Sequence, residues 1–308
     1  MTNLKLVRLA ASATVLLAAA FTFTPAQAEP AVSGINAKVT AFGGGGDIAG
    51  NGDRGTGGIA ASVTAPLMLN LGLQVDGAFA RLGGDNFYDT GAHLFWRDPT
   101  IGLLGVYAGF AHIDGFGGQD FGRVGAEAHR FLGNLTLEGT LGARFGDVAN
   151  RAYGSAKIQY YPIDNLMFSG GYEYEGRNFG TLGAEYQLTS RNGMGLSLFA
   201  DSQISNRDNF LVLGGLRIFF GGDDSLISRH RRQDPSNYVM PDMTAGQQAL
   251  SAAAKRLPQS TAPACPFVPQ TANQCQLQIQ CNGAGYTVAS PGPAACGCTA
   301  VLGVPVPC

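Results

Sequence analysis

A two-residue alternation of apolar and polar side chains recurs along most of this chain, in segments of about ten residues between residues 33 and 220. The last segment, residues 210–220, shows the pattern clearly: its even positions are apolar apart from Gly214, and Arg217 falls on the opposite face. Successive side chains of a β-strand point to opposite faces. Each segment therefore predicts a strand with one apolar face and one face that accepts charge.

About twelve such segments are separated by turn signals, among them Asp98-Pro99, Gly133-Asn134 and Asp164-Asn165. An apolar face recurs on nearly every strand and no second core-forming pattern accompanies it, which disfavours a soluble β-sandwich. Apolar residues facing outward and small or polar residues facing inward are typical of transmembrane strands. We therefore predict an all-β fold, an antiparallel transmembrane up-and-down β-barrel over residues 33–221. About 12 strands are expected, or 10 if a weak early pair is misassigned, because single-chain bacterial barrels have even strand numbers.

An even number of strands returns both ends of the barrel to the periplasmic side, where short turns are expected, whereas longer loops face outward. Four consecutive glycines and Asn51-Gly52 predict a loop over residues 43–55, and a second long loop is expected near residues 114–120. Aromatic residues at the predicted periplasmic ends indicate an interfacial girdle. They are Trp96, Phe131, Tyr160, Tyr161 and Phe220.

Residues 1–28 have the pattern of a secretory signal peptide, with Lys5 and Arg8 before an apolar run and small residues at the end. No other stretch is long and apolar enough to predict a transmembrane helix. Charged residues make up 14% of the chain and the net charge is −2, so no general attraction to nucleic acid is expected.

Residues 222–260 predict a linker with two features. The first is a basic run, residues 228–232, which we interpret as a solvated face; near an anionic surface each basic residue would contribute about 1 kcal/mol. The second is a short helix over residues 244–257, with Thr244 as its N-cap and Pro258 after its end.

Residues 261–308 predict a small tail held by disulfides, because a segment this short has little core and an oxidising compartment is expected. A zinc site is disfavoured by the spacing of Cys296 and Cys298 and by the lack of a nearby histidine. A short hairpin around Asn282-Gly283 is also expected. Six cysteines allow 15 pairings, among which the sequence does not choose. The cysteines are Cys265, Cys275, Cys281, Cys296, Cys298 and Cys308.

Residues 160–174, together with residues 217–221 and 225–232, resemble porin-like outer-membrane β-barrel proteins of Gram-negative bacteria, with an alphaproteobacterial source expected. Gly215, Ile218 and Phe220 resemble the closing-strand signal that the outer-membrane insertion machinery reads, although Leu213 stands where that pattern usually has a polar residue. The resemblance covers roughly residues 33–238 and implies the fold and the membrane. It implies no activity and no site residues.

The informative residues are charged side chains predicted to face the lumen, whose near balance argues against a strongly ion-selective pore. They are Lys38, Asp76, Arg123, Glu127, Glu138, Arg144, Lys157, Glu173, Glu185, Asp201 and Arg217. Such charges either line a narrow water path or pair across it and close it. The first hypothesis is a passive channel for small solutes. The alternative is a closed structural barrel whose periplasmic tail or surface loops bind a cell-envelope partner.

A lipid-modifying enzyme is a third and weaker hypothesis, since no motif marks a nucleophile, and His93, His112 and His129 are interpreted as ordinary lumen or loop residues. No catalytic, cofactor-binding or metal site is predicted, and the expectation is a protein that is not an enzyme. Expected partners are outer-membrane lipid, the insertion machinery and, through the tail, cell wall or an envelope protein. The predicted location is the outer membrane, with the C-terminal tail in the periplasm.

Overall fold

The computed structural model describes residues 29–47, 54–115, 117–205, 210–233, 239–256, 278–282 and 285–289. The chain divides into two units, residues 1–254 and residues 255–308. The predicted signal peptide lies outside the described residues. So do all predicted disulfide cysteines except Cys281, of which only the backbone is described.

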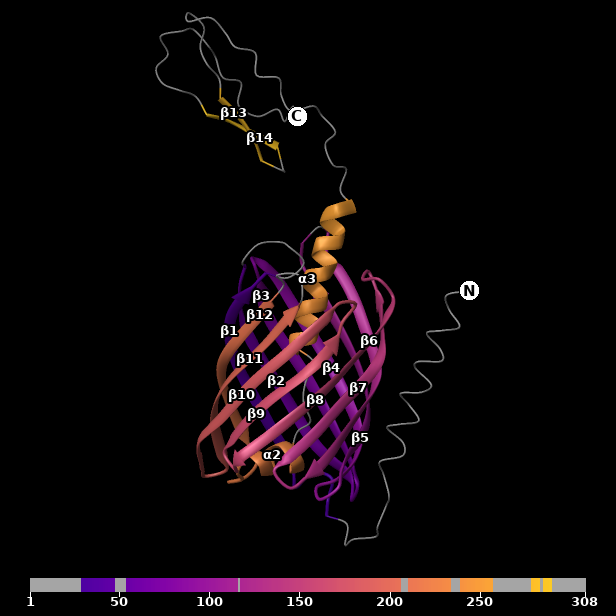
Figure 1. The fold of residues 1–308 in the computed structure, drawn as a ribbon, viewed down its shortest axis with the longest axis vertical. Coiled ribbons are helices and arrows are strands. Elements are labelled where there is room, and N and C mark those ends of the chain that lie inside the picture. Colours follow the sequence, from indigo (N-terminus) through magenta and orange to yellow (C-terminus); the bar gives the residue numbers. More distant parts are fainter. Residues whose placement is uncertain are drawn as a thin grey trace, which may run out of the picture. The chain divides into compact units, whose positions relative to one another are not determined.

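The first unit contains twelve antiparallel strands, and each pairs with its neighbours in the sequence. β1 also pairs with β12, with Ala37 opposite Phe220, so the sheet closes into a barrel (Figure 1). The prediction of a 12-stranded barrel is thus confirmed. The strands are β1 (Asn36–Gly46), β2 (Arg54–Met68), β3 (Leu71–Leu82), β4 (Asp85–Asp98), β5 (Gly102–Ile113), β6 (Gln119–Leu132), β7 (Leu135–Gly146), β8 (Arg151–Ile163), β9 (Leu166–Tyr174), β10 (Asn178–Arg191), β11 (Met194–Ser205) and β12 (Phe210–Phe220).

The apolar faces of the strands point outward, so large apolar side chains such as Ile59 and Leu182 are about 60% exposed. β5 is apolar on both faces, and the structure resolves its orientation: Val106 faces out, whereas Tyr107 is buried inside. Gly109 makes this possible, because a Cβ atom there would lie 2.2 Å from the Tyr107 hydroxyl oxygen. The missing side chain gives the aromatic ring its space on the inner face.

The predicted loop over residues 43–55 starts too early, because β1 continues through Gly46. A Cβ atom on Gly44 would lie 1.9 Å from the carbonyl oxygen of Val212, and one on Gly46 would lie 1.9 Å from that of Phe210. These glycines are therefore required by the close approach of β1 to β12. Considered alone, four consecutive glycines predict the end of a strand. Next to β12, the same glycines let β1 continue.

The connections at the two ends of the barrel differ in length. At one end, which we call the turn end, the connections are residues 69–70, 99–101, 133–134, 164–165 and 192–193. The other end, the loop end, has residues 47–53, 83–84, 114–118, 147–150, 175–177 and 206–209. The start of β1 and the end of β12 both lie at the turn end.

Two helices follow β12 in the first unit. α2 (Leu226–Arg232) lies across the turn end, and α3 (Val239–Arg256) stands inside the barrel and runs toward the loop end (Figure 1). No helix among the described residues has both the length and the hydrophobicity needed to cross a bilayer. In the second unit, β13 (Gln278–Asn282) and β14 (Gly285–Ala289) form the antiparallel pair that the sequence predicts.

Candidate functional site: the occupied lumen

The barrel interior holds all eleven of the charged side chains that the alternation places there. Most of them are buried, and this group consists of Lys38, Asp76, Arg123, Glu127, Glu138, Arg144, Glu173 and Glu185. Lys157, Asp201 and Arg217 are partly exposed to a cavity of about 170 Å³ within the lumen. Burying a charge costs free energy unless the charge is paired. The partners of these groups therefore indicate whether the lumen is an open water path or is closed.

His93 of β4 links two acidic residues of the wall. Its Nε2 atom lies 2.9 Å from Asp76 Oδ2 and its Nδ1 atom lies 3.0 Å from Glu127 Oε1, with the imidazole fully buried. The imidazole also lies against the ring of Tyr107, with 4.5 Å between ring centroids. Gln74 extends the chain of hydrogen bonds by donating to Asp76. This network ties β3, β4 and β6 together across the inner face.

A second buried cluster joins the wall to α3. Arg123 lies 2.6 Å from Asp242 Oδ1 of α3 and 3.1 Å from Glu175 Oε1, and Arg144 lies 2.8 Å from Glu175 Oε2. The guanidinium group of Arg123 also stacks on the ring of Tyr153, 4.5 Å from its centroid. Sequence reasoning missed Asp242 and Glu175. The signal for Asp242 was its position as the single charged residue between Asp234 and Lys255, within the segment interpreted as a linker.

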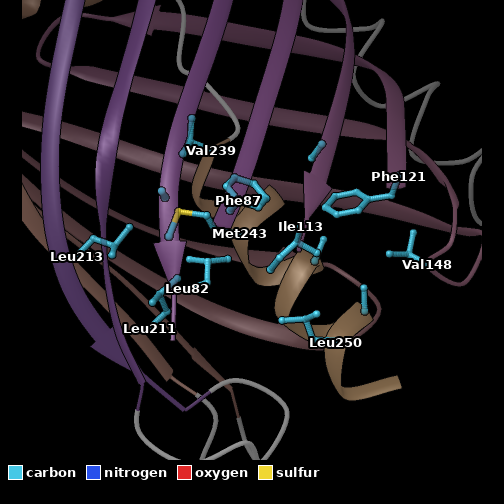
Figure 2. Close-up of a cluster of buried hydrophobic side chains, with 14 of the residues drawn as sticks. Leu82, Phe87, Ile113, Phe121, Val148, Leu211, Leu213, Val239, Met243 and Leu250 are labelled. Carbon is cyan, nitrogen blue, oxygen red and sulfur yellow. The ribbon is translucent and has the colours of Figure 1, made fainter. Parts of the chain in front are cut away.

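One face of α3 is apolar and packs against the barrel wall. Its residues recur at positions 239, 243, 246 and 250, which is the spacing of a single helical face. Val239, Met243 and Leu250 are buried by side chains from several strands (Figure 2). Burying a side chain of this size contributes about 1.5–3 kcal/mol. The wall residues of this cluster include Leu82, Phe87, Ile113, Phe121, Leu211 and Leu213.

Thr244 is not the N-cap that the sequence predicts, because α3 begins five residues earlier, at Val239. The side chain of Thr244 is fully buried and donates a hydrogen bond to Gln203 of β11. Gln203 in turn donates to Glu173 at 3.0 Å. Pro241 lies in the first helical turn, where the lack of an N–H group is tolerated, so it does not prevent the earlier start.

α2 covers the turn end, held by apolar and polar contacts. Leu226 packs with Tyr161, Met167 and Phe219 in a buried cluster. The guanidinium group of Arg229 donates to Gln187 Oε1 at 3.1 Å. Further hydrogen bonds from Arg229 go to Ser190 Oγ, Gln233 Oε1 and the carbonyl of Gly222.

The interpretation of residues 228–232 as a solvated charge run is therefore wrong for Arg229, which has no exposed surface. Arg231 lies over the rings of Phe131 and Tyr161, 5.1 and 5.8 Å from the two centroids. Both rings are buried inside the barrel, which corrects their assignment to the aromatic girdle. Tyr161 also lies 2.8 Å from His230 Nδ1. Arg229, which is buried, and Arg231, which is partly buried, thus both have aromatic and carbonyl partners, and these compensate for the water that the two guanidinium groups lose.

The cavity between α2 and α3 is lined by both signs of charge. Arg217 forms ion pairs with Glu185 and, at 3.1 Å, with Asp201, and its guanidinium group lies 3.9 Å from the centroid of the Phe199 ring. Elsewhere on the wall of the cavity, Lys157 Nζ lies 3.6 Å from Glu138 Oε1. The cavity is bounded by His230 of α2 and by Met240 and Pro241 of α3.

At the loop end, α3 reaches the connection between β5 and β6. A Cβ atom on Gly115 would lie 3.0 Å from Leu250 Cδ2, so the leucine lies against this loop. The loop is itself anchored, since Asp114 accepts a hydrogen bond from Asn86 Nδ2 at 2.8 Å. This bond, with a further contact from His112, holds the pKa of Asp114 below its usual value.

The predicted insertion-signal residues lie in the strand that closes the barrel. Ile218 and Phe220 face outward, and Gly215 approaches β1 so closely that a Cβ atom would lie 2.0 Å from the carbonyl oxygen of Ala41. Among the described residues, no group of three or more His, Cys, Asp or Glu side chains is arranged to hold a metal ion.

A closed antiparallel barrel of twelve strands, apolar outside and polar inside, has the architecture of outer-membrane β-barrels. No protein-family model matches the chain, and no curated protein matches it. Solved structures of outer-membrane β-barrels resemble it in fold. One is the KdgM porin in complex with disordered oligogalacturonate (10% identity, 60% of this chain and 98% of that chain, TM-score 0.43). Others are the translocator domain of the autotransporter NalP from Neisseria meningitidis (11%, 70% and 95%, 0.46) and the COG4313 outer membrane channel from Pseudomonas putida F1 (11%, 65% and 99%, 0.43).

Proposed function

We propose that this protein is an outer-membrane β-barrel that is closed at rest by its own C-terminal segment, with α2 covering the turn end and α3 filling the lumen. The observation that carries the proposal is the docking of α3. Its Asp242 pairs with Arg123, and its Met243 and Leu250 are buried in the wall. Of the first two functions that the sequence suggests, this supports the closed barrel with an interacting C-terminal segment over the open pore.

The closure has two layers with different chemistry. α2 is held mainly by hydrogen bonds and stacking of its basic residues, whereas α3 is held by apolar packing, the Asp242–Arg123 ion pair and the Thr244–Gln203 hydrogen bond. Among the contacts described above, those of α2 go to strands and turns at the turn end, whereas those of α3 go to the inner faces of strands and to the loop end. Removing α3 alone should therefore leave α2 in place, and the two layers can be tested separately.

The test is single-channel conductance in a planar bilayer. We expect the full chain to be silent, a chain ending at Gln233 to show small openings past α2, and a chain ending at Gly221 to show larger and steady openings. Each truncated form must first show the intact barrel by the shift of its band between unheated and heated samples on a denaturing gel. Steady openings from the full chain would refute closure.

A passive channel for small solutes is the second candidate, and the cavity of about 170 Å³ favours it. Its walls carry Lys157, Arg217, Glu138 and Asp201, so the space is polar even with both helices docked. Under this candidate, α3 acts as a gate rather than as a permanent plug. Lys157→Glu in the chain ending at Gly221 should then shift ion selectivity toward cations, with Leu216→Ala on the outer face as the control.

The proposed partners follow from the outer surface of the barrel. Its apolar exterior suits outer-membrane lipid, and the closing strand with Ile218 and Phe220 suits recognition by the insertion machinery. A cell-wall or envelope partner of the C-terminal segment, an alphaproteobacterial source and the absence of enzymatic activity stay predictions. Turnover of a chromogenic ester by the purified protein would contradict the last of these.

A further inference from the structure

The course of α3 along the barrel axis is fixed by contacts at successive depths. Asp242 meets Arg123, which lies within β6. One turn later, a Cβ atom on Gly246 would lie 3.5 Å from Ile113 Cδ1, at the last residue of β5. Another turn later, Leu250 lies against Gly115, in the loop beyond that strand. From residue 242 to residue 250 the helix rises about 12 Å.

The direction of this course is from the turn end to the loop end. α2, which precedes α3, is bonded to the turn end, where Leu226 N–H donates to Asn165 Oδ1 and Arg231 donates to the carbonyl of Leu135. Short connections mark the periplasmic end of outer-membrane barrels and longer connections mark the outer end. α3 thus carries the chain away from the periplasmic end.

The sequence after α3 is compatible with passage through the lumen toward the loop end. Residues 257–308 contain no Asp, Glu, Lys, Arg or His, although the lumen wall is rich in both signs of charge. An uncharged segment forms no ion pairs with Arg123, Glu173 or Arg217 that would hold it inside the barrel. Lys255 and Arg256, the last charged residues, end α3.

We propose that the barrel delivers residues 257–308 to the outer face of the outer membrane, so that the cysteine-rich segment is displayed at the cell surface rather than in the periplasm. The inference rests on the proposed function, since it requires α3 to lie docked in the lumen. The protein would then act as an anchor that presents its own C-terminal segment, and α3 would be the stalk.

The test uses the full chain in Gram-negative cells, with one epitope placed after Cys308. Two matched controls carry the same epitope between Gly133 and Asn134 at the turn end and between Asn51 and Gly52 at the loop end. We expect antibody to label the Cys308 form on intact cells, as it labels the loop-end control, and to label the turn-end control only after the outer membrane is permeabilised. Labelling of the Cys308 form only after permeabilisation would overturn the proposal.

A second measurement uses the untagged sequence. Protease added to intact cells should remove residues after α3 and leave the barrel, identified by mass spectrometry of the remaining fragment. A C-terminus that survives until the membrane is permeabilised would overturn the display. Bilayer recording of the same protein separates the two proposals: a silent protein with an internal C-terminus retains the closed barrel and refutes only display. A conducting full chain refutes closure itself.

Discussion

Replacing Met243 by alanine should loosen α3 without unfolding the barrel. Met243 has no exposed surface and packs in the cluster that contains Leu82, Phe87 and Leu213. Truncation of a buried methionine to alanine costs about 2–5 kcal/mol. None of the inter-strand hydrogen bonds involves α3, so this cost falls on docking of the helix in the lumen. Even the lower value, about 2 kcal/mol, raises the undocked fraction roughly 30-fold, at tenfold for each 1.4 kcal/mol.

The assay is the fraction of time that the full-chain variant spends open in a planar bilayer. Met243→Ala should open often where the parent chain is silent, and the open level should not exceed that of the chain ending at Gln233, because the undocked helix is still present. Leu216→Ala is the control, because Leu216 faces outward and is 43% exposed, so its truncation leaves α3 untouched. If Met243→Ala stays as silent as the parent while truncation at Gln233 opens the pore, the packing of α3 is not what closes the lumen.

The remaining predictions concern other contacts of the two helices. Adding Gly246→Ala to the Met243→Ala chain should reduce the frequency of its openings. Alanine favours a helix interior over glycine by about 1 kcal/mol, and its Cβ atom would make ordinary van der Waals contacts at 3.5 Å. More frequent openings in the double variant would contradict this. Asp242→Asn should make the full chain open more often, by up to about tenfold, because a charge-assisted hydrogen bond contributes about 1.5–3 kcal/mol and the amide retains part of it. Arg229→Ala should raise the conductance of the chain ending at Gln233 toward that of the chain ending at Gly221, since α2 loses its buried hydrogen bonds; an unchanged conductance would mean that Arg229 does not hold the lid.

The strands and the lumen charges could be predicted because both depend on a period of two in the local sequence. Once Ile218 is placed outward, Arg217 has to point inward, and the same reasoning places Glu185 and Lys157. The orientation of β5 could not be predicted, because the position of Tyr107 depends on space left by Gly91 on the neighbouring strand. Likewise, Gly44 belongs to a strand only because β12 passes close to it.

The contents of the lumen could not be predicted for a related reason. The basic neighbours of Arg229 in the sequence indicate a solvent-exposed residue. Its actual partners, Gln187 and Ser190, are about forty residues away in the sequence. Asp242 and Arg123 are more than one hundred residues apart, so no local pattern connects them. The apolar spacing of Val239, Met243 and Leu250 is a local signal for a buried helical face. It does not indicate that the surface that buries it is the inside of the barrel.

The β1–β12 seam also restricts the order in which the molecule can assemble. The seam closes a ring of strands, and α3, which follows β12 in the sequence, lies inside that ring. The ring has to form around the segment, or the segment has to be threaded through the finished ring. With residues 257–308 outside, as we propose, threading requires them to pass through the lumen ahead of α3, a helix about 10 Å across. A disulfide within this segment would join two lengths of chain and make the passing section wider than a single extended chain. Pairing of the cysteines before they have crossed would therefore hinder threading, unless the seam is the last part of the barrel to close.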